Sequence, residues 1–200
     1  MASGETNHGR RRFLVASTSV VGAVGAGFVA VPFLKSWSPS ARAKAAGAPV
    51  EVDISKLGAG QKLTVKWRGK PVFVYRRDQE ILTALFGQND KLLDAKSENI
   101  EQQPSYISDE SRAIKPEIMV LVAICTHLGC VPEYIPEMKA QPFDETWAGG
   151  FYCPCHKSKF DLAGRVYDGV PAPSNLLVPP YHYLGENLLE IGVDPKEANA

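Results

Sequence analysis

A long uncharged apolar run near the amino end dominates the polarity pattern of the chain. It covers residues 13–34 and directly follows three arginines at 10–12. A helix of this length spans about 33 Å, close to the ~30 Å hydrocarbon core of a bilayer. The run is longer than the ~7–15-residue apolar core of a signal peptide. We therefore expect one transmembrane helix over residues 13–35, with a buried core helix or a cleaved signal peptide as alternatives.

The arginines ahead of the apolar run predict its orientation. By the positive-inside rule, residues 1–12 form a cytoplasmic arm, and the rest of the chain lies across the membrane. Paired arginines followed by Phe13 and Leu14 also resemble a twin-arginine export signal. This resemblance implies export of a protein already folded around a cofactor. The expected location is the bacterial inner membrane, single-pass, with a periplasmic head.

A small, alanine-rich segment separates the apolar run from the rest of the chain. Residues 36–49 read SWSPSARAKAAGAP, a composition typical of a flexible linker between anchor and head. Its alanine-rich centre could instead form a helix. Taken alone, the sequence of this segment slightly favours a passive spacer.

From residue 50 onward the pattern changes to short alternating stretches. Such stretches are typical of half-buried strands, and a continuous apolar run of similar length is typical of a buried one. The strand candidates lie at 50–57, 62–67, 67–77, 117–124, 149–153 and 176–193, the last as a hairpin. Helical spacing occurs in 79–100, with a break at Gly87. We therefore expect a mainly β head over 50–200, an antiparallel β sandwich with an inserted helix-loop.

The remaining polar segments of the head predict no chemistry. Residues 101–116 are expected to form an exposed loop, and residues 132–147 a surface insertion between the cysteine-containing segments described below. His182 is expected to pack within the last hairpin. The chain has 22 basic and 22 acidic side chains and a formal net charge of zero. A nucleic-acid-binding protein would show a basic excess, so nucleic acid is not an expected partner.

Two short segments hold all the candidate chemistry. CTHLGC at 125–130 and CPCHKS at 153–158 contain all 4 cysteines and two of the 4 histidines. Each segment follows a predicted strand. Two cysteines and two histidines can hold zinc tetrahedrally, or a [2Fe–2S] cluster with two thiolates on one iron and two imidazoles on the other. The two further thiols have no role at a zinc site, and an exported protein would oxidise them to a disulfide.

These two segments resemble the cluster-binding boxes of the Rieske iron–sulfur family in residue type, spacing and order. GVPAP at 169–173 resembles the family's proline loop, so the cluster-binding part covers about 118–175. The resemblance implies the Rieske fold and one [2Fe–2S] cluster. It assigns Cys125 and Cys153 to the inner iron, His127 and His156 to the outer iron, Cys130 and Cys155 to a disulfide, Leu128 to shielding the cluster and Ser158 to a hydrogen bond with a bridging sulfide.

The anchor, the linker and WRGKPVFV at 67–74 resemble the branch of the family that serves ubiquinol–cytochrome c oxidoreductases. That branch implies cytochrome b-type and cytochrome c-type subunits as partners in a dimeric complex. His127 or His156 would contact ubiquinol, and one electron and one proton would leave it. The electron would continue to a cytochrome c-type haem as the head moves on its linker. The alternatives are the small Rieske subunit of a periplasmic oxidase such as arsenite oxidase, or a structural zinc protein.

Two positions depart from the family pattern. Lys157 stands where the second box usually has glycine, which places a charge beside the cluster and strains the backbone if the position needs a glycine-like conformation. Phe160 stands where many relatives have a tyrosine that donates a hydrogen bond to a ligand sulfur. Neither change removes a ligand, so both bear on the reduction potential.

Overall fold

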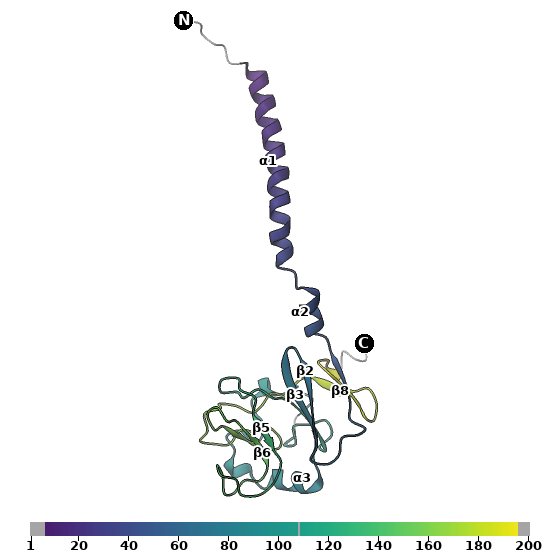
Figure 1. Ribbon diagram of the computed structural model, residues 1–200, viewed down its shortest axis with the longest axis vertical. Coiled ribbons are helices and arrows are strands. Elements are labelled where there is room, and N and C mark those ends of the chain that lie inside the picture. The colour runs from purple at the N-terminus through teal and green to yellow at the C-terminus, as the bar shows by residue number, and fades with distance from the viewer. Residues whose placement is uncertain (1–6, 108, 196–200) are drawn as a thin grey trace. The chain divides into compact units, whose positions relative to one another are not determined.

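The structure is a computed structural model that describes residues 7–107 and 109–195. The chain forms two compact units, Met1–Ala45 and Ala46–Ala200, which are considered separately below. The first contains the apolar helix, and the second contains all the strands that the described residues form (Figure 1).

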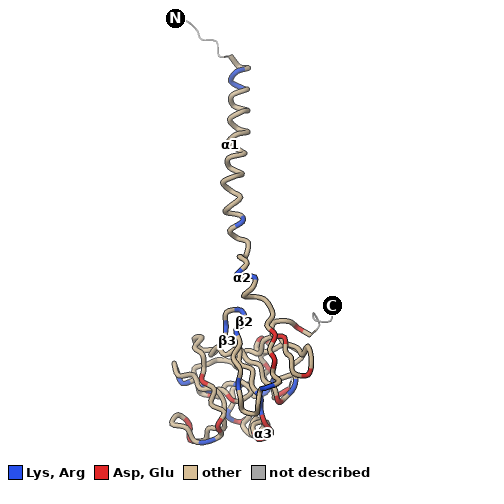
Figure 2. The backbone as a smooth tube through the Cα atoms, turned by 45° about the vertical axis from the view of Figure 1, so that its right-hand side comes forward, with Lys and Arg blue, Asp and Glu red and all other residues tan. Residues whose placement is uncertain are grey.

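The first unit is built on one long helix. Helix α1 covers His8–Ser36, and the Asn7 side chain caps it by accepting a hydrogen bond from the Arg10 amide at 3.1 Å. None of its side chains is buried, although most of them are apolar. Figure 2 shows basic residues near the two ends of α1 and uncharged residues between them. The helix is long and apolar enough to cross a membrane, as expected of a helix that is hydrophobic all round.

The predicted linker contains a short helix. Helix α2 covers Ala41–Ala46, and the Ser40 hydroxyl accepts a hydrogen bond from the Ala43 amide at 3.1 Å. The alanine-rich centre is therefore helical in the structure, which was the alternative to a fully flexible segment.

The second unit consists of three antiparallel three-stranded sheets, with strand orders β1-β9-β8, β2-β3-β4 and β5-β6-β7. The predicted mainly β, antiparallel fold is confirmed (Figure 1). The strands are β1 (Val50–Asp53), β2 (Lys62–Trp67), β3 (Lys70–Arg76), β4 (Ile118–Val122), β5 (Glu133–Ile135), β6 (Gly150–Tyr152), β7 (Lys159–Phe160), β8 (Tyr181–Tyr183) and β9 (Leu188–Ile191).

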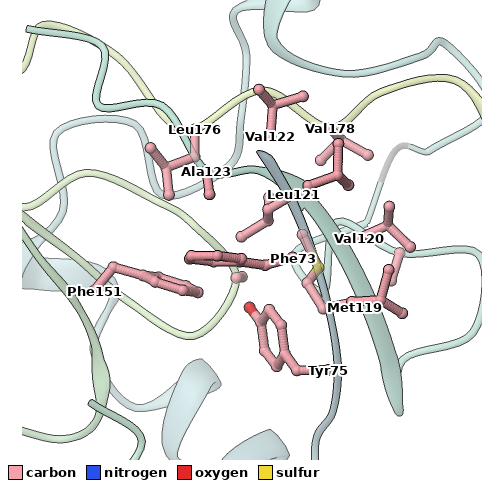
Figure 3. Packing of buried hydrophobic residues seen from close by; sticks show 14 of the residues in the cluster. Phe73, Tyr75, Met119, Val120, Leu121, Val122, Ala123, Phe151, Leu176 and Val178 are labelled. Carbon is pink, nitrogen blue, oxygen red and sulfur yellow. The ribbon is translucent and has the colours of Figure 1, made fainter. Parts of the chain in front are cut away.

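The core of this unit lies around β3 and β4. All five residues of β4 are buried, as the continuous apolar run predicted. Figure 3 shows Phe73 and Tyr75 of β3 near Phe151 of β6. The rings of Phe73 and Phe151 stack with centroids 6.0 Å apart, and the Tyr75 hydroxyl donates to the Leu162 carbonyl at 2.7 Å. Each large apolar side chain buried here contributes about 1.5–3 kcal/mol. The strands that lead into both cysteine segments are thus held in the same core.

The helical stretch is shorter than expected. Helix α3 covers Gln79–Phe86 and ends at Gly87; only short 3-10 turns follow, at Asn89–Lys91 and Ile100–Gln102. The Asp94 carboxylate accepts a hydrogen bond from the Glu98 amide at 2.8 Å. Such local side-chain bonds compete with helical ones, so the helix does not resume after the glycine.

The expectation that residues 101–116 form an exposed loop is wrong for its central part. Arg112 is fully buried, and Ile107 is 3% exposed. The Arg112 guanidinium donates to the carbonyl oxygens of Ala163 and Leu176, both at 2.9 Å. A buried arginine is tolerated here because backbone carbonyl oxygens satisfy its donors.

A second arginine is buried in the same way. Arg77 donates to the carbonyl oxygens of Pro116 at 2.8 Å, Ser111 at 2.9 Å and Leu162 at 3.2 Å. Burial lowers the pKa of Arg77, and it lowers the pKa of Arg112 to about 10.

The insertion at 132–147 packs as predicted beside the metal-binding part, but it is not wholly on the surface. Trp147 is 3% exposed, and its indole N–H donates to the Ile135 carbonyl at 3.1 Å. His182 lies within the last hairpin, as expected, and faces Glu190 across the β8–β9 pair.

Candidate metal centre

The first cysteine segment is a tight loop at the end of β4. The Cys125 amide donates to the Cys130 carbonyl at 2.8 Å, and the Gly129 amide donates back to the Cys125 carbonyl at 3.0 Å. Gly129 has a φ of 84°, in the left-handed region that glycine enters at no steric cost. The loop is therefore closed by its own backbone, which fixes the directions of the side chains between the two cysteines.

The second segment forms the same loop at the end of β6. The Cys153 amide donates to the Ser158 carbonyl at 2.8 Å, and the Lys157 amide donates to the Cys153 carbonyl at 2.9 Å. Lys157 has a φ of 65°, so it adopts the left-handed conformation that Gly129 adopts in the first loop. The condition under which a lysine is strained here, a glycine-like backbone at this position, is therefore met.

A disulfide joins the two loops. It links Cys130 to Cys155, whose Cα atoms lie 6.7 Å apart, and this is the pairing that the family resemblance implied. The sulfur atoms of Cys130, Cys153 and Cys155 lie within 4.8 Å of one another. That grouping is not a ligand set, because the disulfide already takes two of its sulfurs. Cys125 and Cys153 stay free, and both are buried.

The imidazole rings of the two loops lie next to each other. The rings of His127 and His156 have centroids 4.6 Å apart and stand at 90° to each other. His127 is half-buried, and among the described residues its Nδ1 atom finds no hydrogen-bond partner. His156 is exposed. A buried ring nitrogen without a partner destabilises a folded protein. A metal ion bound to Nδ1 of His127 would remove this cost.

The free thiols lie in an environment that calls for a nearby positive charge. Burial raises the pKa of the Cys125 thiol, and its hydrogen bond with Cys153 adds to this, whereas bonds from the His127 amide and the Ser158 hydroxyl oppose it. A thiolate is therefore costly here unless a metal ion compensates its charge. Two adjacent buried thiols and two adjacent imidazoles fit a cluster held by mixed ligands.

The proline loop is bonded to the second cysteine segment, and Ser174, which follows the loop, is bonded to the first. The Ser158 hydroxyl accepts a hydrogen bond from the Ala172 amide at 3.1 Å, and the Thr126 hydroxyl donates to the Ser174 carbonyl at 2.7 Å. Ser158 is fully buried, whereas Leu128 is 70% exposed. The structure thus places Ser158 between the proline loop and the free thiol of Cys125, and it extends Leu128 into solvent. Cluster shielding by Leu128 stays a prediction.

A buried ion pair in the turn after β7 was missed by sequence reasoning. Arg165 donates from Nε to the Asp161 carboxylate at 2.7 Å, and both side chains are fully buried. Arg165 also donates to the carbonyl oxygens of Leu85 at 2.7 Å and Ala95 at 3.0 Å. The pair therefore joins the turn after β7 to the inserted helix-loop. Its one sequence signal was an acidic and a basic residue four positions apart in DLAGR.

These donors define an iron–sulfur electron carrier of the mixed cysteine–histidine type. A family model described as "Rieske [2Fe-2S] domain" matches residues 49–182. Another, described as "Ubiquitinol-cytochrome C reductase Fe-S subunit TAT signal", matches residues 1–40. The chain belongs to the Rieske [2Fe–2S] family, its cofactor is a [2Fe–2S] cluster, and the structural zinc alternative is set aside.

Curated relatives match along almost the whole chain. The ubiquinol-cytochrome c reductase iron-sulfur subunit of Allochromatium vinosum is 56% identical over 194 residues, covering 97% of this chain and 93% of that protein. The subunit of the same name from Blastochloris viridis is 40% identical, covering 96% and 98%. A solved structure titled "Hyperthermophilic respiratory Complex III" is 27% identical with a TM-score of 0.47, covering 88% of this chain and 98% of that one.

Proposed function

We propose that this chain is the membrane-anchored Rieske subunit of a bacterial ubiquinol–cytochrome c reductase. The observation that carries the proposal is the pair of imidazoles, 4.6 Å apart, beside two buried free thiols in disulfide-linked loops. Relatives with that name match 96–97% of the chain, including the apolar helix. These full-length matches favour the respiratory subunit over a small subunit of an arsenite oxidase.

The proposed ligands are Cys125 and Cys153 for one iron and His127 and His156 for the other. When bound, the cluster supplies a one-electron acceptor whose potential lies above that of all-cysteine clusters, because two neutral imidazoles replace two thiolates. The two loops hold these four side chains by backbone hydrogen bonds, so little rearrangement is needed when charge arrives.

His156 is the proposed contact for ubiquinol. It is the more exposed of the two imidazoles, and an imidazole can accept a hydrogen bond and then a proton from the quinol hydroxyl. His156 would take up one proton of the quinol, and the cluster, when bound, would supply the acceptor for one electron. The exposed Leu128 supplies apolar surface beside this contact, which suits a quinol pocket in a cytochrome b-type subunit.

The membrane arrangement completes the proposal. Helix α1 is the anchor, and the arginines at its start stay on the cytoplasmic side, so the head lies in the periplasm. There it delivers the electron to the haem of a cytochrome c-type subunit within a dimeric complex. Residues 36–49 allow the head to move between the quinol site and the haem.

Electron paramagnetic resonance of membranes containing this chain tests the proposal. Ubiquinol should produce the signal of a reduced [2Fe–2S] cluster with imidazole ligands, and added oxidised cytochrome c should remove it. Replacement of His156 with serine should abolish the response. A cluster that arsenite reduces and ubiquinol does not would favour the oxidase subunit instead.

A further inference from the structure

Lys157 is an exposed cation that the fold does not explain. It directly follows His156, and its backbone lies in the left-handed region with φ 65°. A side chain in this conformation is strained, and Gly129 avoids the strain at the equivalent place in the first loop. The strain is therefore a property of the lysine side chain, because a glycine would close the loop equally well.

The Lys157 side chain makes no stabilising polar contact with the described residues of its own chain. Across residues 7–107 and 109–195, its ammonium group has no hydrogen bond, ion pair or ring contact. The next lysine along the chain differs. Lys159 is bonded to the Asp144 carboxylate at 2.6 Å and lies 5.2 Å from the Tyr167 ring centroid. Lys157 thus presents an uncompensated positive charge beside a proposed ligand.

This charge lies at the edge of a groove. The groove has a volume of about 400 Å³ and is lined by Pro142, Phe143, Tyr152, Lys157 and Lys159. Phe143 and Tyr152 stack with centroids 4.0 Å apart and an angle of 11° between their planes. Asp144 neutralises Lys159, so Lys157 supplies the groove with its net positive charge. A side chain that enters should be anionic at its tip and able to lie along aromatic rings.

We propose that Lys157 and this groove bind an acidic side chain of the cytochrome c-type subunit while the head delivers its electron. The proposal rests on the proposed function, because that function brings the face around His156 against a cytochrome. An Asp or Glu carboxylate of the partner would pair with Lys157, and its aliphatic stem would lie on Phe143 and Tyr152. Strain at a site that makes no internal contact is typical of residues retained for function.

Carbodiimide cross-linking of the assembled complex tests the contact directly. The reagent joins a lysine amine to a carboxylate that lies against it. We expect a linked peptide pair between Lys157 and an acidic residue of the cytochrome c-type subunit, and its loss in Lys157→Gln. A link from Lys157 only to carboxylates of this chain, to another subunit, or to nothing would overturn the proposal.

Electron transfer from the reduced cluster to the haem, measured against ionic strength in the same complex, gives a second readout. Lys157→Gln removes the charge and keeps an unbranched polar side chain, so the rate at low salt should fall roughly two- to fivefold and its salt dependence should weaken. Lys157→Arg should retain both. The matched control is Lys56→Gln, which removes an exposed charge in the segment after β1.

A redox titration of each variant separates docking from tuning of the cluster. If Lys157→Gln slows transfer only as far as its altered potential explains, with an unchanged salt dependence, the proposal fails. If the unmodified complex transfers no electron from cluster to haem, the proposed function itself fails, and the cross-linking result still reports on the contact.

Discussion

The two cysteine segments share one backbone and differ in the side chains they place on it. In both, the first amide donates to the sixth carbonyl, and the fifth amide donates back to the first carbonyl. The third and fourth positions are His127 and Leu128 in the first loop, but Cys155 and His156 in the second. One loop geometry therefore offers an imidazole from either of two adjacent positions, which lets two similar loops face each other without identical contents.

The sixth residue also differs between the two loops. Cys130 of the first loop joins the disulfide, whereas Ser158 of the second is buried and bonds the proline loop through Ala172. The first loop is thus held covalently at this position and the second by a hydroxyl group.

Removal of an imidazole from either loop should have the largest effect. Replacement of His127 or His156 with serine should abolish the cluster or its high potential, because each is proposed to bind the same iron. Iron content and the reduced-state paramagnetic resonance spectrum measure this. His182→Ser is the matched control, since His182 lies in the last hairpin. A wild-type spectrum in either loop variant would exclude that histidine as a ligand.

Removal of the link between the loops should come next. The double replacement of Cys130 and Cys155 with serine should lower the free energy of unfolding by about 2–4 kcal/mol. Thermal unfolding of the cluster-containing protein measures it, and mass mapping without reductant should find the linked peptide in the parent protein. Equal unfolding temperatures for the two proteins would show that backbone hydrogen bonds suffice to hold the loops together.

The fifth position tests whether the two backbones are equivalent. Lys157→Gly should raise the free energy of unfolding by about 1 kcal/mol, because a left-handed backbone costs a non-glycine residue about that much. Gly129→Lys should lower it by a similar amount. Chemical denaturation of both variants measures the pair. Effects of the same sign would show that the loops do not impose the same strain.

Phe160, the second residue of β7, tests hydrogen bonding to a proposed ligand sulfur. Phe160 is fully buried, so Phe160→Tyr would place a hydroxyl in the interior. A hydrogen bond that favours the reduced cluster by about 1 kcal/mol should raise the potential by roughly 40 mV. A redox titration at neutral pH measures the shift. No shift, or a downward one, would mean that the ring at 160 does not face a ligand sulfur.

The smallest effect should come from the ion pair that follows the second loop. Burial raises the pKa of Asp144, but hydrogen bonds from Lys159 and Thr146 outweigh it and hold the pKa below its ordinary value. The pair therefore stabilises the fold above the carboxyl's ordinary pKa of 3.8, and this contribution disappears as the pH falls through the lower folded value. Asp144→Asn should cost less than about 1 kcal/mol at neutral pH and nothing in acid. A cost that persists unchanged in acid would assign the effect to packing.

The sequence predicted the cysteine segments better than the buried polar groups and loops that surround them, for a physical reason. Cysteine and histidine indicate a metal site by type and spacing, and the family resemblance of two six-residue segments implied the disulfide pairing that the structure contains. The assignment of the four ligands stays a prediction. The burial of Arg112 could not be predicted, because its guanidinium is bonded to carbonyl oxygens that are distant in sequence. In the sequence it therefore resembles any solvated charge. The helical pattern of 79–100 likewise could not show that Asp94 would bond the backbone locally.

The buried arginines have a consequence for the energetics of electron arrival. In the described part of the head, the fully buried charged side chains are Arg77, Arg112, Arg165 and Asp161, a net positive interior. Each guanidinium is held by hydrogen bonds to carbonyl oxygens or to the carboxylate. These groups therefore cannot reorient when the head gains an electron. A medium whose dipoles and charges are already fixed has little left to reorganise. The interior that anchors the polar segments thereby also lowers the reorganisation energy of the redox step.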